Sequence, residues 1–353
     1  MKKEMGRAGK LALAMCLAGT MMMGGCGKSA DALEGTVTAG DTKAAEGTKE
    51  AESTDKGYKV LIGCSNRAQS FYAWLADACV QEINANYPDI TCEIYDLKGD
   101  STNVPTMVEL AETGGYNGII VDQVDETDYS DLYEAARENG IYTVMTNDSR
   151  EPNGIVTLIG LNNYGLGHTV GEAAAEKLPK NARLLVIPGP GDVCALDRRD
   201  GFFDALKEAG REDVTILAEQ NSIDWQKENG MSVMEDWTQK YGESDFDAVY
   251  CSNDDLAVGC IEVCAAAGYD TQKLQFYGID GLANGCNAVK NGTMTVTVLQ
   301  NCNDQAKTAA ECIYNMMTGK DTECKKILLD PEVITSDNVD EIIAMHEANG
   351  MLK

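Results

Sequence analysis

Short apolar segments rich in β-branched residues alternate with longer segments of helical period from residue 58 onward. We predict strands at 59–62, 91–95, 118–121, 142–145, 156–159, 183–187, 214–217, 248–251, 274–277 and 295–299. Amphipathic helices are expected between most of them, for example at 72–84, 127–139, 166–177, 204–209 and 304–317. Strands that are apolar throughout are typical of parallel sheets covered by helices on both faces. This number of strands favours an α/β fold of two doubly wound lobes over a single sheet.

The first 57 residues do not follow this alternation. Four cationic side chains lie within residues 1–10, an apolar stretch spans 11–23, and two glycines stand directly before Cys26. This order is typical of a secretory signal, which we expect to span 1–25. A short membrane helix is the alternative, but the stretch is brief and contains glycine. Residues 26–57 after it contain no aromatic residue and too few apolar ones to fold, so they predict a flexible tether.

Composition excludes several classes of function. The net charge of −28 argues against nucleic acid as a partner. Two histidines leave little material for imidazole catalysis or histidine metal sites, and we expect neither a metal nor a cofactor. No dinucleotide fingerprint, phosphate-binding loop or nucleophile elbow accompanies the predicted strands. The eleven cysteines after Cys26 include no CxxC pair, and many lie in apolar patterns where a free thiol packs as a small hydrophobe.

Polar and aromatic residues gather directly after the predicted strands, where open α/β sheets bind their ligands. The candidate ligand-binding residues are Gln69, Phe71, Tyr72, Asp122, Asn147, Asp148, Asp192, Arg198, Trp225, Asn253, Asp280 and Gln300. Carboxylates, amides and a guanidinium suit hydroxyl groups, which both donate and accept hydrogen bonds. Aromatic rings suit the C–H faces of a sugar ring. The set therefore predicts a sugar-binding site with no catalytic residue.

Each of these positions also has a purely structural interpretation. Asn253 precedes an apolar segment and is a suitable helix N-cap, and Asp280 followed by Gly281 is typical of a turn. Phe71 and Trp225 are compatible with the core, and Arg198 with a surface ion pair. The shared location at strand ends favours the functional interpretation over these alternatives.

Four stretches resemble the type 1 periplasmic-binding proteins, and within them the galactose/glucose- and ribose-binding branch. They are 247–259 (DAVYCSNDDLAVG), 276–281 (FYGIDG), 298–307 (VLQNCNDQAK) and 198–202 (RRDGF), and the likeness covers 58–335. By position, the resemblance implies that Phe71 and Trp225 sandwich the sugar ring while the polar residues bind its hydroxyls. Asp192 stands where the galactose-binding relative has histidine, and Gln69 and Gln300 also differ from it, so the identity of the sugar stays open. Met23-Gly24-Gly25-Cys26 resembles a lipobox, which implies a lipid on Cys26.

The resemblance also implies an architecture and a role. One lobe would comprise 58–161 and 301–329, the other 162–300 and 330–353, joined by a three-strand hinge. The expected protein is a monomeric, extracytoplasmic lipoprotein, anchored to the outer face of the bacterial cytoplasmic membrane. It would capture a monosaccharide such as galactose, glucose, ribose or xylose and deliver it to an ABC permease.

Two other functions remain open from the residues. The same fold is compatible with a receptor for a sugar-like signal, a polyol or a nucleoside. A secreted carbohydrate-active enzyme would use two of the clustered carboxylates, such as Asp122 and Asp280. A sugar-responsive transcription factor is rejected because no basic DNA-binding segment precedes the first strand.

Overall fold

The structure is a computed structural model that describes residues 57–148 and 150–352. The predicted signal (1–25), Cys26 and all but the last residue of the predicted tether lie outside the described residues. Within 57–148 and 150–352, no helix combines the length and apolarity that crossing a bilayer requires. The eleven cysteines of this part are all free, and seven of them are buried.

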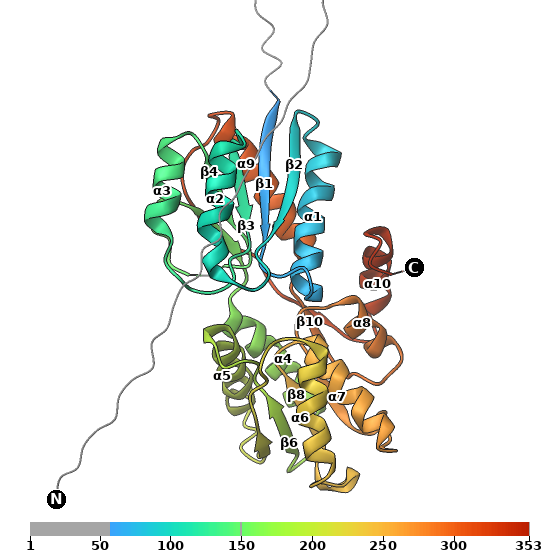
Figure 1. Cartoon of the computed structure of the whole chain (residues 1–353). Helices are drawn as coiled ribbons and strands as arrows, with labels where there is room; N and C mark the ends of the chain where they lie inside the picture. Colours follow the sequence, from blue (N-terminus) through green and yellow to red (C-terminus); the bar gives the residue numbers. More distant parts are fainter. Residues whose placement is uncertain (1–56, 149, 353) are drawn as a thin grey trace, which may run out of the picture. The chain divides into compact units, whose positions relative to one another are not determined.

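The first sheet has six strands, all parallel, in the order β11-β5-β4-β3-β1-β2. Figure 1 labels four of them, β1 to β4. Its strands are β1 (Tyr58–Cys64), β2 (Ile90–Asp96), β3 (Gly118–Val121), β4 (Tyr142–Met145), β5 (Thr157–Gly160) and β11 (Lys326–Leu328). The edge strand β11 therefore comes from a part of the chain far beyond the other five. The chain reverses its direction of progress across the sheet between β1 and β3, which creates a topological switch point there.

Helices cover both faces of the first sheet because its central strands are apolar on both sides. They are α1 (Ser70–Asn86), α2 (Val104–Thr113), α3 (Ser130–Glu138) and α9 (Cys302–Met317), with a short 3-10 helix at Ser101–Asn103. Val60 and Ile62 belong to the core cluster that contains the buried residues of α1 and α9. Leu61, between them, belongs to the cluster that contains those of α2 and α3. This alternation is the period-two geometry of a strand.

The second sheet has four parallel strands in the order β7-β6-β8-β9. They are β6 (Arg183–Ile187), β7 (Thr215–Glu219), β8 (Ala248–Cys251) and β9 (Gln275–Tyr277). Isolated bridges, Tyr277 to Val296 and Asp280 to Leu299, connect it to β10 (Thr297–Leu299), which pairs antiparallel with β12 (Glu332–Ile334). The switch point of this sheet lies between β6 and β8.

The second sheet is also covered on both faces. Leu184 and Val186 of β6 pack in the cluster that contains α4 (Asn163–Lys177) and α5 (Val193–Glu208). Leu185 and Ile187 pack in the cluster with α6 (Lys227–Thr238), α7 (Asp254–Ala266) and α8 (Ala283–Lys290). A second 3-10 helix spans Glu243–Asp245, and α10 (Val339–Ala348) follows β12. The predicted α/β fold class with parallel sheets is confirmed.

The prediction for α5 is wrong at its beginning. We expected this helix at 204–209, whereas α5 begins at Val193 and ends at Glu208. Its first half buries Ala195 and Arg198 rather than large apolar side chains, so the hydrophobic period does not show in the sequence. Arg198, one of the predicted ligand-binding residues, therefore lies in a helix that periodicity alone does not detect.

Glycines let α4 and α5 pack with their backbones in contact. A Cβ atom on Gly167 would lie 1.8 Å from the carbonyl oxygen of Arg198, and one on Gly201 would lie 2.1 Å from that of Tyr164. Backbone atoms cannot move aside as a flexible side chain can. The close approach consequently fixes the position of α5, and with it the backbone of Arg198.

Helix α10 packs against α8 and also contacts α1 through one histidine. His346 is fully buried, its Nε2 lies 2.8 Å from the carbonyl oxygen of Gly281, and its ring meets that of Trp74 edge-on at 4.8 Å. Nε2 therefore carries the proton that it donates to this carbonyl, and the buried Nδ1 has no partner among the described residues. Burial lowers the pKa of His346, although the Gly281 carbonyl opposes that shift.

Acidification should remove a part of the stability that depends on His346. Because the folded-state pKa of this histidine is below its ordinary value of 6.5, the unfolded chain binds the proton more readily once the pH falls below about 6.5. We expect the stability advantage of the wild type over His346→Gln to shrink from pH 7.5 to pH 5, by up to ~1.4 kcal/mol per pH unit. Urea unfolding of both proteins across this range measures the difference. An advantage that grows on acidification would contradict the assignment.

Candidate ligand-binding site

A cavity of about 930 Å³ lies at the carboxyl ends of the strands that border both switch points. Its walls carry residues that follow β1 and β3 of the first sheet, and residues that follow β6 and β8 of the second. All twelve residues predicted from the sequence line this cavity, namely Gln69, Phe71, Tyr72, Asp122, Asn147, Asp148, Asp192, Arg198, Trp225, Asn253, Asp280 and Gln300. Their role in binding a ligand stays a prediction.

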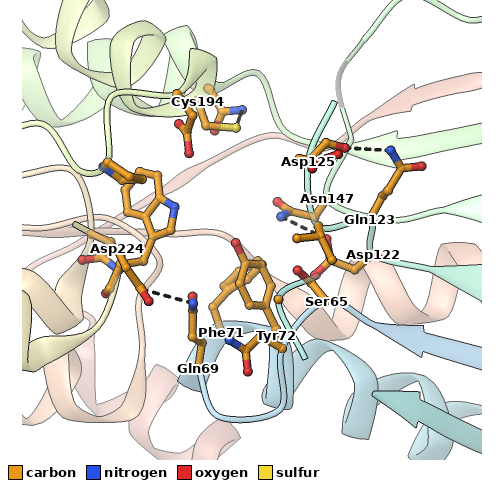
Figure 2. A pocket seen from close by; sticks show the side chains of 18 of the residues that line it. Ser65, Gln69, Phe71, Tyr72, Asp122, Gln123, Asp125, Asn147, Cys194 and Asp224 are labelled. Atoms are coloured by element: carbon orange, nitrogen blue, oxygen red, sulfur yellow. Dashed lines mark hydrogen bonds between the residues drawn. The ribbon is translucent and has the colours of Figure 1, made fainter. Parts of the chain in front are cut away.

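Asp122 and Asn147 follow adjacent strands of the first sheet and meet inside the cavity (Figure 2). The Asn147 side-chain amide donates to Oδ1 of Asp122 at 3.4 Å, and its backbone N–H donates to Oε1 of Gln305 at 2.8 Å. Asn147 has a φ of 56°, a left-handed conformation that asparagine adopts more readily than most residues. Burial raises the pKa of Asp122 well above its usual range, and Asp148 adds to that rise.

Arg198 and Asp280 form a buried ion pair, with Nη1 and Oδ1 separated by 3.2 Å. Arg198 also donates from Nε to Oδ1 of Asn163 at 3.0 Å and from Nη1 to the carbonyl oxygen of Ser252 at 2.8 Å. The amide of Gln300 donates to the same Asp280 oxygen at 3.4 Å. Burial raises the pKa of Asp280 to about 7, even though Arg198 lowers it. The surface ion pair considered for Arg198 is thus wrong.

Asn253 and Asp280 each have a structural role in the backbone and also line the cavity. Asn253 caps α7 by accepting from the backbone N–H of Leu256 at 2.9 Å, and its amide donates to the carbonyl oxygen of Trp225 at 2.9 Å. Its side chain therefore also anchors the loop that carries the tryptophan. Asp280 has a φ of 111° and forms an isolated bridge with Leu299 in place of the turn considered from the sequence, and it also lines the cavity.

Trp225 lies directly over a glycine. A Cβ atom on Gly189 would lie 2.7 Å from two carbons of the indole ring, and the φ of Gly189 is 99°. Gly189 therefore leaves space for the indole ring, which the side chain of any other residue at this position would fill. The Arg198 guanidinium lies 5.5 Å from the centre of the indole ring, within reach of a cation–π interaction.

Gln69, Phe71 and Tyr72 line the cavity from the start of α1 (Figure 2). The amide of Gln69 donates to Oδ1 of Asp224 at 3.2 Å, which joins the segment after β1 to the segment after β7. The rings of Phe71 and Tyr72 meet edge-on at 5.8 Å.

Two predicted residues have their carboxylates engaged by the protein. Both oxygens of Asp148 accept hydrogen bonds from the Arg150 guanidinium, at 2.6 to 3.2 Å. Asp192 is the N-cap of α5 and accepts from the backbone N–H of Ala195 at 2.8 Å. These contacts leave them less capacity for a ligand than Asp122 has.

Sequence reasoning missed several side chains that line the cavity. The missed residues include Arg150, Asn163, Cys194, Asp224 and Asp255. Asn163 and Asp224 were detectable, because the former follows the end of β5 closely and the latter precedes Trp225. Burial raises the pKa of the Cys194 thiol to about 11, so this side chain is a protonated thiol at neutral pH. Among residues 57–148 and 150–352, no group of three or more histidine, cysteine or acidic side chains is placed to hold a metal ion.

Comparison with known proteins decides the family. Residues 60–321 match the periplasmic binding protein domain. The chain belongs to the periplasmic binding protein family. This periplasmic binding protein is 27 % identical to the ribose import binding protein of Bacillus subtilis over 228 residues, 64 % of this chain and 72 % of that protein. It is 25 % identical to the xylitol-binding protein of Mycolicibacterium smegmatis over 245 residues, 69 % of this chain and 68 % of that protein.

Solved structures share the fold of this periplasmic binding protein. An ABC transporter solute binding protein from Bacillus halodurans with bound myo-inositol matches with a TM-score of 0.73 at 24 % identity, covering 83 % of this chain and 99 % of that one. The binding component of the arabinose ABC transporter of a Shewanella species matches with a TM-score of 0.74 at 19 % identity, covering 84 % and 99 %.

Proposed function

We propose that this protein is an extracytoplasmic receptor that captures a monosaccharide or a related polyol and delivers it to an ABC importer. The observation that carries the proposal is one cavity at the two switch points, lined by all twelve residues that the sequence predicts for binding a hydroxylated ring. The named relatives support it, since they bind ribose and xylitol. The ligand is held by Arg198, Asp280, Gln300 and Asn253 from one side and by Asp122, Asn147 and Gln69 from the other.

The cellular setting of this proposal rests on the sequence. The segment 1–25 is a secretory signal, and Cys26 carries a lipid that anchors a monomeric protein to the outer face of the cytoplasmic membrane. The ligand-binding lobes are 58–161 with 301–329 and 162–300 with 330–353. Mass spectrometry of the membrane-extracted protein tests the anchor, because acylated Cys26 would be the first residue of the mature chain.

We also propose that the protein is not an enzyme. Arg198 and Gln300 both contact Asp280, so this carboxylate is engaged by the protein rather than free for acid–base work. Calorimetric titration with aldoses, polyols and nucleosides, followed by chromatography of the recovered ligand, tests receptor and enzyme together. A receptor binds one of these compounds and returns it unchanged. Conversion of the sugar, abolished in Asp280→Asn, would establish the enzyme instead.

Trp225→Ala should weaken sugar binding by about 1 to 3 kcal/mol, because the stacking surface for the ring is lost. Trp225→Phe keeps an aromatic face and should retain a large part of the affinity. Titration calorimetry on both variants, with urea unfolding to confirm their stability, measures the difference. Full affinity in a folded Trp225→Ala protein would remove Trp225 from the site.

A further inference from the structure

The charge on the cavity wall is strongly one-sided. Nine carboxylates and three cationic side chains line the cavity. Two of the three cations are already paired within the wall, Arg150 with Asp148 at 2.6 Å and Arg198 with Asp280 at 3.2 Å. The third, Lys98, is exposed and makes no ion pair with a described residue. The wall thus retains unneutralised negative charge and offers little attraction to an anionic ligand.

Asp122 is the carboxylate that this imbalance affects most. Only 4 % of its surface is exposed, and no described residue donates a hydrogen bond to its Oδ2. Its other oxygen accepts from the neutral amide of Asn147 alone, and no cationic side chain of the described residues forms an ion pair with it. A buried carboxylate without a cation is costly, as the raised pKa of Asp122 also indicates.

We infer that the ligand is a protonated amino polyol, an amino sugar or an aminocyclitol, whose ammonium group lies against Asp122. This inference rests on the proposed function, since it names the ligand class of the same cavity. An ammonium group supplies hydrogen-bond donors to the free oxygen and the positive charge that the wall lacks, whereas a hydroxyl group supplies a donor only. The remaining hydroxyls of such a ligand meet Arg198, Asn147 and Gln300 as those of a neutral sugar would.

Matched ligands separate charge from shape. We would titrate the purified protein with D-glucosamine, D-galactosamine, D-mannosamine and amino-deoxy-scyllo-inositol, and with the parent hexoses and scyllo-inositol. N-acetylglucosamine keeps the nitrogen but removes its charge. The same series would include ribose, xylose, arabinose, fructose, xylitol and sorbitol. At least one amine should bind ten or more times more tightly than its parent and than any neutral member.

The variant Asp122→Asn tests the position of the ammonium group. It preserves the shape of the side chain and removes its charge, so the affinity for the amine should fall at least ten times further than the affinity for its neutral parent, which also loses its contact with the Asp122 carboxylate. Asp131→Asn, at an exposed position in α3 away from the cavity, is the matched control and should leave both affinities unchanged. Circular dichroism confirms that each variant is folded.

The outcomes distinguish this inference from the proposed function. Tight binding of a neutral sugar or polyol with no preference for an amine would overturn the inference and leave the receptor function standing. An amine preference that survives unchanged in folded Asp122→Asn would also overturn it. Absence of binding by every member of the series would overturn both.

Discussion

Arg198→Ala should be the most damaging single substitution in the cavity. It leaves Asp280 buried without its partner, and breaking a buried ion pair in this way costs about 3 to 5 kcal/mol of folding free energy. The pKa of Asp280 is already about 7, so acidification neutralises this carboxylate in the folded protein and offsets part of the loss. The destabilisation measured by urea unfolding should consequently be larger at pH 8 than at pH 5.5. Equal destabilisation at both pH values would contradict the pairing.

Loss of Arg198 should also abolish ligand binding, and a second variant separates the two effects. Arg198→Met combined with Asp280→Asn removes both charges and keeps most of the buried volume, which restores stability in many buried pairs. We expect this double variant to regain most of the lost stability and still bind at least a hundredfold more weakly than the wild type. Calorimetric titration measures the affinity. Recovery of binding along with stability would show that the pair only supports the fold.

Gly167→Ala should be nearly as damaging, although residue 167 lies outside the cavity. The added methyl group would meet the backbone of Arg198 at 1.8 Å, so α4 and α5 must separate. Overpacking of this kind typically costs 1 to 3 kcal/mol, and we expect a loss of about 3 kcal/mol because the obstructing atoms belong to the backbone. The shift of α5 should weaken ligand binding as well, since it moves Arg198.

Gly165→Ala provides the matched control in the same helix. A Cβ atom at this position would lie 3.5 Å from its nearest neighbour, an ordinary van der Waals contact. Alanine also favours the helix over glycine by up to about 1 kcal/mol. Thermal unfolding should therefore show Gly165→Ala at or above the wild-type midpoint and Gly167→Ala well below it. Similar midpoints for the two variants would refute the close packing of α4 on α5.

Much of the fold could be predicted because its strands are apolar on both faces. The four residues of β3 and of β8 are all buried, and such segments stand out in a sequence. The edge strand β11 could not be predicted in the same way, since it has three residues and none of them is buried. Its pairing with β5 depends on contacts that are distant in the chain.

The site could be predicted as a set of positions but not as a set of contacts. The rule that ligands bind beyond the carboxyl ends of strands locates Asp122, Arg198 and Asp280 from the sequence alone. It could not show that Arg150 forms an ion pair with Asp148, or that Arg198 forms one with Asp280. Those partnerships depend on side-chain directions, which spacing along the chain does not specify. The absence of a described hydrogen-bond partner for Oδ2 of Asp122 likewise becomes visible only in the structure.

The position of β11 in the sequence determines the order in which the two sheets can form during synthesis. Every strand of the second sheet from β6 to β9 is synthesised before residue 278, whereas the first sheet still lacks α9 and β11 at that moment. During synthesis, the second sheet can therefore be completed before the first sheet, although the first sheet begins earlier in the chain. Until the last tenth of the polypeptide arrives, β5 offers an open sheet edge to any strand that reaches it, including one from another nascent copy.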